Sequence, residues 1–260
     1  MKAHKWHIPT ALLTERIQVI LVGAGGTGGE MLDRLIRVHH GLVKTGHPGG
    51  LHVTLVDGDT ISEANIGRQR FAPFDVGQAK ASTLIHRANV AFGLDWEAKD
   101  EYASPKEWWH CDLLVTCVDR AGFRAEVGVG GRYRNDDTLW LDTGNGATTG
   151  QVVLGHLGTP DSGSRLPNVY DLYPELEGVN DDAEPSCSFA EAIRHQDLTI
   201  NPMIADAAAN ILWRMLRHGG LDFHGATVDL TRGSVAPLPI DPRTWEFFGY
   251  RGEPAKAGAA

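Results

Sequence analysis

The chain has 260 residues, which fits a single large α/β domain, and 42% of them are hydrophobic, which is enough to bury an ordinary globular core. Its 24 basic residues stand against 33 acidic ones, so the formal net charge is −9. Such a charge repels a phosphate backbone, and the sequence has no local basic patch, so we expect no nucleic-acid binding. No apolar run approaches the roughly 18–20 residues that cross a bilayer, and none lies near the N-terminus, so we expect neither a membrane segment nor a secretory signal.

The three cysteines, Cys111, Cys117 and Cys187, form no C-x-x-C pair. This spacing argues against a disulfide scaffold and a structural zinc site, and it suits the reducing cytoplasm. Cys111 and Cys117 lie six residues apart in an expected strand, so their side chains should share one face as small buried groups. The twelve histidines lack the spacing typical of a metal site, and we expect them at the surface.

The first part of the chain alternates between strand and helix patterns. Residues 17–22 form a nearly continuous apolar and β-branched run, which predicts a buried parallel strand. A glycine-rich turn over 23–29 follows, and apolar residues then recur at helical spacing over 31–38. A connection rich in Gly, His and Pro over 39–50 leads to a second strand at 51–56.

The rest of the chain continues this alternation. The pattern predicts a helix at 79–91, strands at 96–102, 111–118, 139–142 and 151–154, and a late hairpin that pairs 226–230 with 234–238. Alternating strands and helices predict a Rossmann-like, doubly wound, mostly parallel sheet with a C-terminal antiparallel hairpin. In such a sheet, ligands bind at the carboxyl ends of the strands.

Residues 158–185 interrupt the alternation. They are rich in Gly, Pro, Ser and acidic residues, which predicts a long, mobile surface loop. Asn201-Pro202 then favours a helix start, with Asn201 as its cap. We expect a single domain over residues 1–260 with three parts: a nucleotide-binding part at 17–157, a mobile crossover loop at 158–186, and C-terminal helices and a hairpin at 187–250.

The glycine-rich turn lies between an expected strand and an expected helix. In this context, glycines let the backbone approach a phosphate or ribose closely, and the helix N-terminus offers free N–H groups. The candidate residues are Gly23, Gly25, Gly26 and Gly28. The alternative is a tight turn without a binding function. The loop alone does not distinguish an ATP site from an NAD site.

Four further residues follow the second strand and make the site more specific. Asp57 closes that strand, where a carboxylate can accept both ribose hydroxyls, although a solvent-exposed turn acid is the alternative. Asn65, Arg68 and Lys80 add one amide and two cations beyond the ribose position. Phosphoryl chemistry needs such donors, whereas hydride transfer has no evident use for them. For Arg68 and Lys80 the alternative is a solvated surface charge.

These residues occur in a sequence of motifs that resembles a known superfamily. The motifs are Gly-x-Gly-Gly-x-Gly at 23–28, Asp-x-Asp-x-x-x-x-x-Asn-x-x-Arg-Gln at 57–69, Gly-x-x-Lys-Ala at 77–81, and Val118-Asp119 after a strand. Over roughly residues 17–155 they resemble the adenylation domain of ThiF, MoeB and ubiquitin-activating enzymes. The segments 65–71 and 185–192 resemble, more narrowly, the ThiF-family member of the PRTRC gene set.

The resemblance implies roles for residues that contact the nucleoside. Gly25 and Gly26 would pack against the adenosine and the α-phosphate. Asp57 would hold the ribose, and Asp59 belongs to the same binding motif.

The resemblance also implies roles along the triphosphate. Asn65 and Arg68 would bind the phosphates with Gln69 beside them, and Lys80 would neutralise charge on the α-phosphate as pyrophosphate leaves. Asp119 would hold Mg²⁺ through its carboxylate, a hard oxygen ligand that suits this ion. A helix N-cap is the bland alternative for Asp119.

Arg68, Lys80 and Asp119 are thus candidate catalytic residues, and Cys187 is a fourth. Cys187 lies where members of this superfamily place a cysteine that forms a thioester or an acyl persulfide. Other members stop at the adenylate, so a purely structural cysteine is an equal alternative. The paired zinc motifs of MoeB are absent, so we expect no zinc. The N-terminal arginine that many members lend to a partner subunit is not recognisable, with Arg16 as the candidate, and Arg120 replaces the common Asn after the magnesium aspartate.

The sequence therefore predicts an enzyme that uses ATP and Mg²⁺ to adenylate the C-terminal carboxylate of a small ubiquitin-like (β-grasp) or sulfur-carrier protein. Transfer to Cys187 would follow in the thioester-forming variant. The superfamily resemblance also implies a homodimer. Two alternatives stay open: an NAD-dependent oxidoreductase, and a non-catalytic nucleotide-binding scaffold.

Overall fold

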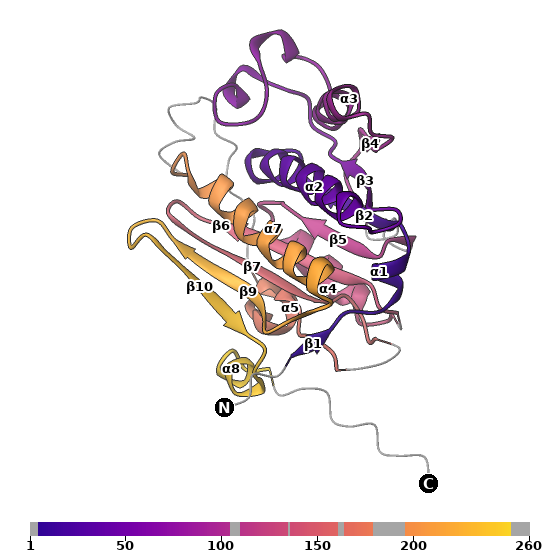
Figure 1. The fold of residues 1–260 in the computed structure, drawn as a ribbon. Coiled ribbons are helices and arrows are strands. Elements are labelled where there is room, and N and C mark those ends of the chain that lie inside the picture. Colours follow the sequence, from indigo (N-terminus) through magenta and orange to yellow (C-terminus); the bar gives the residue numbers. More distant parts are fainter. Residues whose placement is uncertain (1–4, 105–109, 135, 161–163, 179–195, 251–260) are drawn as a thin grey trace.

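The computed structural model describes residues 5–104, 110–134, 136–160, 164–178 and 196–250. Within them, one sheet of eight strands has the order β10-β9-β7-β6-β5-β2-β3-β4 (Figure 1). The parallel strands are β2 (Ile17–Val22), β3 (Leu51–Val56), β4 (Glu97–Lys99), β5 (Leu113–Thr116) and β6 (Leu139–Asn145). The antiparallel strands are β7 (Thr149–His156), β9 (Phe223–Asp229) and β10 (Ser234–Pro239).

This arrangement confirms the predicted Rossmann-like α/β fold with antiparallel strands at the C-terminal end. The strands at 17–22 and 51–56 have the predicted bounds. β4 and β5 are shorter than predicted, and β6 and β7 are longer. A separate two-stranded sheet pairs β1 (Trp6–His7) with β8 (Gly220–Leu221).

Helices connect and cover the strands. They are α1 (Ala11–Thr14), α2 (Gly26–Lys44), α3 (Lys80–Phe92), α4 (Ala121–Gly131), α5 (Val169–Leu172), α7 (Ile200–His218) and α8 (Pro242–Phe247), with short 3₁₀ turns η1 (Glu63–Asn65), η2 (Pro73–Asp75) and η4 (Pro174–Gly178). In Figure 1, α2 and α7 lie together in front of the sheet, and α4 and α5 lie behind it. The core fills the space between these layers.

The strand order reverses between β2 and β5. The chain runs outward from β2 through α2 to β3, then returns to the other side of β2 to form β5 and continues through α4 to β6. Because parallel crossovers are right-handed, α2 and α4 must cover opposite faces of the sheet. The carboxyl ends of β2 and β5 thus lie at the position where open α/β sheets bind ligands.

The helix α2 extends further than the sequence predicted. A Gly- and His-rich connection was expected over 39–50, but the helix continues to Lys44. Gly41 explains the difference, because a Cβ atom there would lie 2.7 Å from the Trp213 ring of α7. The glycine lets the two helices pack closely, and this long-range contact outweighs its low helix propensity.

The prediction of a surface loop over 158–185 is wrong for its middle part. Leu166 and Tyr170 are buried, and Tyr170 belongs to the short helix α5. A Cβ atom on Gly128 would lie 2.2 Å from the Tyr170 ring, and the Arg132 guanidinium lies 4.6 Å from the centre of the same ring. The aromatic ring therefore pins this segment against α4.

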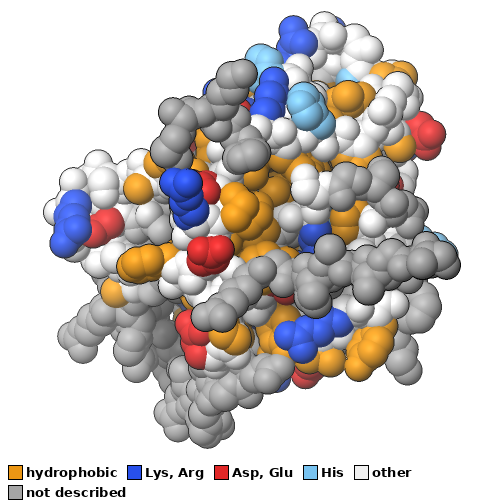
Figure 2. All heavy atoms as spheres, turned by 90° about the horizontal axis from the view of Figure 1, so that it is seen from below, with side chains coloured by type: hydrophobic (Ala, Val, Ile, Leu, Met, Phe, Trp, Pro, Cys, Tyr) orange, Lys and Arg blue, Asp and Glu red, His pale blue; other side chains and the backbone are white. Residues whose placement is uncertain are grey.

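Surface properties agree with the composition. On the face shown in Figure 2, basic and acidic side chains lie scattered among neutral ones, so the described residues in this view present no basic patch. Across the ranges given above, none of the helices combines the length and the apolar character needed to cross a membrane.

Two histidines are buried rather than at the surface as expected. The His224 Nδ1 donates to the Leu154 carbonyl oxygen (2.7 Å), and its Nε2 accepts a hydrogen bond from Trp245 Nε1 (2.8 Å). His156 Nδ1 accepts from the Leu166 amide (2.9 Å). Burial lowers the pKa of both imidazoles to about 4.

Acid should therefore weaken the fold. Between the unfolded pKa of about 6.5 and the folded value of about 4, the unfolded chain takes up a proton at His224 that the folded chain excludes. This proton uptake is absent above neutral pH, and at pH 5 it lowers the free energy of unfolding by roughly 2 kcal/mol. In urea unfolding, the free energy of unfolding of the wild type should fall between pH 7.5 and pH 5. In His224→Gln this fall should be smaller by roughly 2 kcal/mol. The exposed His86→Gln should keep the wild-type difference, and an unchanged difference in His224→Gln would contradict the assignment.

Candidate functional site

The glycine loop at the end of β2 is built by close backbone contacts. Gly23 has a φ of +95°, and a Cβ atom there would lie 2.5 Å from the carbonyl oxygen of Cys117, which follows β5. A Cβ atom on Gly28 would lie 1.8 Å from the Gly23 carbonyl oxygen. These two glycines are required because the end of β5 and the first turn of α2 both press against the loop.

Gly25 differs from its neighbours. It is the N-cap residue of α2, no side chain caps the helix there, and a Cβ atom would meet nothing within 4 Å. Gly26, in contrast, abuts the Asn201 side chain, whose Nδ2 would lie 2.5 Å from a Cβ atom. The open space beside Gly25, in front of a helix N-terminus, is suited to an anionic group.

Asp57 ties the end of β3 to this loop. Its Oδ2 accepts a hydrogen bond from the Ala24 amide (2.6 Å), and its Oδ1 accepts one from the Asp59 amide (2.8 Å). Burial raises the pKa of the carboxyl group, and the two backbone N–H groups partly offset this. Asp57 is thus not a solvated turn acid, and it lies beside the loop as the ribose role requires.

Lys80 is not a solvated surface charge either. It is the first residue of α3 and is only 7% exposed. Its Nζ donates to Asp59 Oδ2 (2.8 Å), while Asp59 Oδ1 accepts a hydrogen bond from the Tyr102 hydroxyl (3.0 Å). Partial burial alone would raise the pKa of Asp59, but Lys80 and Tyr102 together lower it. The pair holds a buried cation close to Asp57, and Tyr102 is a member of the site that no sequence motif indicated.

Arg68 and Asp119 lie near each other although their positions are far apart in the sequence. Burial lowers the pKa of Arg68, and the charge of Asp119 opposes this shift. Among the described residues, Arg68 has only one hydrogen bond, from Nε to the Ala64 carbonyl oxygen (3.4 Å), and no ion pair within 4 Å. A half-buried guanidinium with so few partners is well placed for an anionic ligand.

Asp119 is exposed in the turn between β5 and α4. The alternative of a helix cap does not hold, because the N-cap residue of α4 is Arg120 and no described side chain makes a capping hydrogen bond. The described residues contain no group of three or more His, Cys, Asp or Glu side chains that could hold a metal. Asp119 could therefore contribute one ligand to an ion held mainly by a phosphate.

Two amide side chains complete this part of the site. Asn65 is buried, and its Oδ1 accepts hydrogen bonds from the Ser62 amide (2.9 Å) and hydroxyl (3.2 Å), which fixes the turn η1. Its Nδ2 has no partner among the described residues. The Gln69 Oε1 is buried without a hydrogen bond in the same part of the structure. A buried oxygen without a hydrogen bond, as at Gln69, is uncommon in folded proteins and fits a site that a ligand completes.

A second polar cluster, which the sequence did not reveal, lies on the other side of the glycine loop. Thr27 Oγ1 donates to Asn201 Oδ1 (2.8 Å), and Asn145 Nδ2 donates to the same oxygen (3.0 Å). The prediction of Asn201 as a helix cap is wrong, because α7 begins at Ile200 with Thr199 as the N-cap residue. The Asn201 side chain turns instead to α2 and β6, and only the fold brings these elements together.

The remaining candidates are Cys187, Arg16 and the other two cysteines. Cys187 belongs to residues 179–195, outside the described residues. Arg16 directly precedes β2, at the amino ends of the parallel strands, where its guanidinium pairs with Asp95. Burial raises the pKa of both Cys111 and Cys117 to about 12, so these two thiols are poor nucleophiles, as expected for buried cysteines.

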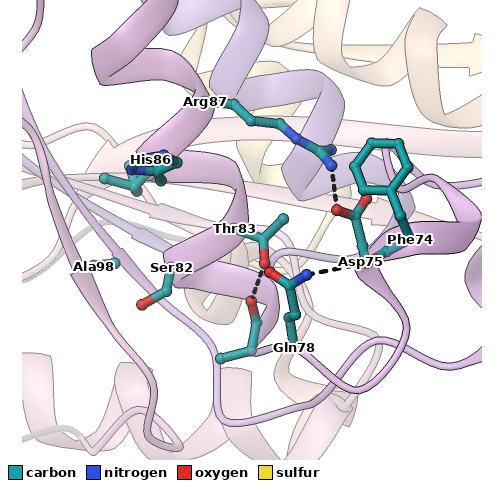
Figure 3. Close-up of a pocket in the computed structure, with 10 residues that line it drawn as sticks. Phe74, Asp75, Gln78, Ser82, Thr83, His86, Arg87 and Ala98 are labelled. Atoms are coloured by element: carbon teal, nitrogen blue, oxygen red, sulfur yellow. Dashed lines mark hydrogen bonds and ion pairs between the residues drawn. The ribbon is translucent and has the colours of Figure 1, made fainter.

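A pocket of about 640 Å³ lies beside α3 and η2 (Figure 3). Its walls include Ser82 and His86 of α3, together with the Arg87–Asp75 ion pair and the ring of Phe74. None of the residues that line it belongs to the predicted nucleotide site. The site described above lies instead at the carboxyl ends of β2, β3 and β5.

The glycine contacts allow a direct test of the loop. Gly28→Ala should lower the free energy of unfolding by about 3 kcal/mol or more, because its methyl group has no space against the Gly23 carbonyl oxygen. Gly25→Ala, with an open position and an ordinary φ of −74°, should cost no more than about 1 kcal/mol. Urea unfolding of both variants measures the difference, and equal stabilities would show that the loop is not packed in this way.

Comparison with known proteins finds a matching family and several solved structures with a similar fold. The model of the ThiF family matches residues 11–234. Solved structures with a similar fold include PaaA (TM-score 0.58, 13% identity, 88% of this chain and 65% of that chain) and E. coli MccB with ATP (TM-score 0.58, 14% identity, 88% and 65%). A further one is E. coli MccB with MccA-N7isoASN (TM-score 0.56, 14% identity, 87% and 65%). Among curated proteins, no sequence match is found.

These similarities establish the fold that the chain shares with PaaA and MccB. The chain spans about 65% of the length of these structures.

Proposed function

The chain belongs to the ThiF family, and from this premise we propose that it uses ATP to adenylate the carboxylate of a peptide or small protein. The observation that carries the proposal is the arrangement at the strand ends. Gly25 faces open space, Lys80 is buried next to the turn after β3, and Arg68 lies near Asp119 without an ion-pair partner among the described residues. The cations and the helix N-terminus supply the donors that a triphosphate needs.

The order of the strands supports the following placement of ATP in the proposal. Asp57 after β3 takes the ribose, the open space beside Gly25 after β2 takes the α-phosphate, and Asp119 after β5 lies towards the β- and γ-phosphates. Lys80, held by Asp59, faces the α-phosphate from the β3 side. An NAD site would need only the glycine loop and Asp57, and would leave these cations without a function.

Arg68, Asn65 and Gln69 share the task of binding the phosphates. The amide nitrogen of Asn65 and the guanidinium of Arg68 act as donors. Gln69 supplies the carbonyl oxygen that lacks a hydrogen bond, which can accept from a nucleotide hydroxyl or a bound water.

In the proposed reaction, a carboxylate oxygen of the substrate attacks the α-phosphorus of ATP. A new oxygen–phosphorus bond forms as the bond to the pyrophosphate breaks, and the products are an acyl-adenylate and pyrophosphate. The nucleophile is already an anion, so no general base is needed. The protein positions the two anions and stabilises the developing charge, with Lys80 at the α-phosphate and Arg68 at the leaving group.

Asp119 fits a magnesium ion that travels with ATP. Mg²⁺ binds through one or two carboxylates together with phosphates and water rather than in an all-protein cage, which matches a single exposed carboxylate. When bound, the ion neutralises charge on the phosphate oxygens.

The substrate and the fate of the adenylate are further parts of the proposal. MccB has been crystallised with ATP and with MccA-N7isoASN, and a peptide or protein carboxylate suits the proposed chemistry here. The motif resemblance supports a ubiquitin-like β-grasp carrier, as in PRTRC gene sets, and a homodimeric enzyme in the cytoplasm. Transfer to Cys187 is the step that mass spectrometry of the enzyme, incubated with carrier and ATP, would reveal.

Arg68→Ala tests the phosphate site. The change should weaken MgATP binding about tenfold or more, and lower ATP–pyrophosphate exchange with an added β-grasp carrier by about 10²–10³-fold, because a donor to the leaving group is lost. Calorimetry measures the binding and radiolabel exchange the reaction.

Arg70→Ala is the matched control. Arg70 lies in the same segment, but its guanidinium contacts Glu30 (3.5 Å) and Asp33 (3.6 Å) of α2. The Arg70→Ala variant should bind MgATP with the same Kd as the wild type. Equal binding by Arg68→Ala and Arg70→Ala would remove the assignment of Arg68.

A further inference from the structure

A buried ion pair lies behind the turn that carries Asp119. Arg124 of α4 is 8% exposed and Asp142 of β6 is 1% exposed. The Arg124 Nε lies 2.9 Å from both carboxylate oxygens of Asp142. No motif in the sequence indicated either residue, and the pair joins α4, which follows the turn, to β6.

The guanidinium makes two further hydrogen bonds, and both reach backbone carbonyls. Arg124 Nη2 donates to the Val118 carbonyl oxygen (2.6 Å) and to the Thr143 carbonyl oxygen (2.8 Å). Val118 directly precedes Asp119. One side chain therefore clamps the turn after β5 to the end of β6.

The carboxylate that holds Arg124 is itself fixed. Thr116 Oγ1 donates to Asp142 Oδ1 and accepts a hydrogen bond from Trp140 Nε1 (2.9 Å). Thr143 Oγ1 donates to the Thr116 carbonyl oxygen (2.9 Å). Each link comes from β5 or β6, so the position of Arg124 is set by the sheet.

Asp119 has no such fixation of its own. Among the described residues, its carboxylate makes no hydrogen bond and no ion pair within 4 Å, so its position depends on the backbone on either side. On the N-terminal side of Asp119, the Cys117 amide donates to the Val22 carbonyl oxygen (2.9 Å), and the Val118 carbonyl oxygen accepts from Arg124. Of these two contacts, only the one to the Val118 carbonyl oxygen comes from a side chain.

We propose that Arg124, held by Asp142, is a positioning residue that places the Asp119 carboxylate for magnesium-bound ATP. The inference rests on the proposed function. A buried ion pair adds little stability compared with a well-packed apolar pair. The hydrogen bond from Arg124 to the Val118 carbonyl oxygen, in contrast, holds the backbone directly before Asp119, whose carboxylate must meet the ion. Groups that orient a metal ligand typically alter metal affinity 10–100-fold when they are changed.

Arg124→Lys tests the proposal. An ammonium group keeps the charge opposite Asp142 but lacks the planar fork that also reaches two carbonyls. By calorimetry, the Kd for MgATP should rise about 10–100-fold, while the Kd for ATP in EDTA should stay within about twofold. Equal loss in both conditions, or no loss in either, would overturn the positioning role.

Arg165→Lys is the matched control for the substitution. Arg165 also pairs with a carboxylate, Asp171 (2.7 Å), and also donates to a backbone carbonyl, Gly158 (2.9 Å), but it lies beside α5 away from the strand ends. The Arg165→Lys variant should leave the Kd for MgATP and the Kd for ATP in EDTA unchanged. Failure of the wild type to bind ATP with or without Mg²⁺ would overturn the proposed function, and this inference with it; a wild type that binds MgATP beside an unaffected Arg124→Lys would overturn the positioning role alone.

A second variant and a measurement without nucleotide keep the test independent of folding problems. Asp142→Asn preserves the shape of the side chain and removes its charge, so it should weaken the clamp more gently. Hydrogen exchange of the peptide that contains Val118 and Asp119 should be faster in Asp142→Asn than in the wild type, with no change in Arg165→Lys. Unchanged exchange together with unchanged MgATP binding would contradict the proposal.

Discussion

The close contact between the glycine loop and the turn after β5 sets the geometry on which the rest of the site depends. The Gly23 backbone lies against the Cys117 carbonyl, and Gly28 lies against Gly23, with no space for a side chain at either position. The ends of β2 and β5 are thereby held in contact. Asp57 adds β3 through its hydrogen bond to the Ala24 amide. Three strand ends thus share one small surface, and each of them contributes a polar group to it.

The charges around this surface are arranged before any ligand arrives. The chain as a whole is acidic, with a formal charge of −9, yet Lys80 is buried and Arg68 half-buried near its centre. Asp59 keeps the Lys80 ammonium in place, and the Arg124–Asp142 pair holds the turn that bears Asp119. Catalysis by charge stabilisation depends on such preorganisation, because groups that are already oriented need not reorganise as charge develops. The fold supplies this rigidity from buried strands rather than from the surface.

The sequence predicted the parts of the molecule that depend on local pattern. The apolar runs of β2 and β3 fixed both strands to the residue, and the placement of the glycine motif, Asp57 and Lys80 at strand and helix ends followed from them. The sequence could not predict contacts between distant segments. The packing of Trp213 on Gly41 lengthens α2, and the Tyr170 ring on Gly128 buries a segment whose composition is typical of a loop.

The same limit applies to the site. Tyr102, Asn145 and Arg124 carry no recognisable motif, and each contributes only because the sheet brings its element beside another. The two buried histidines were likewise unpredictable, since imidazole is polar and its burial requires specific partners. Leu154 of β7 and Trp245 of α8 provide them for His224, and Leu166, before α5, provides one for His156. Motif spacing therefore predicted residues for the proposed nucleotide site, but not the residues that hold them in place.

A crystal structure of the protein with ATP and Mg²⁺ tests the central claim most directly. The account predicts the ribose at Asp57, the α-phosphate beside Gly25 within hydrogen-bonding distance of Lys80, the outer phosphates on Arg68, and the metal on the Asp119 carboxylate. Phosphates bound elsewhere, with Arg68, Lys80 and Asp119 turned away from them, would contradict it.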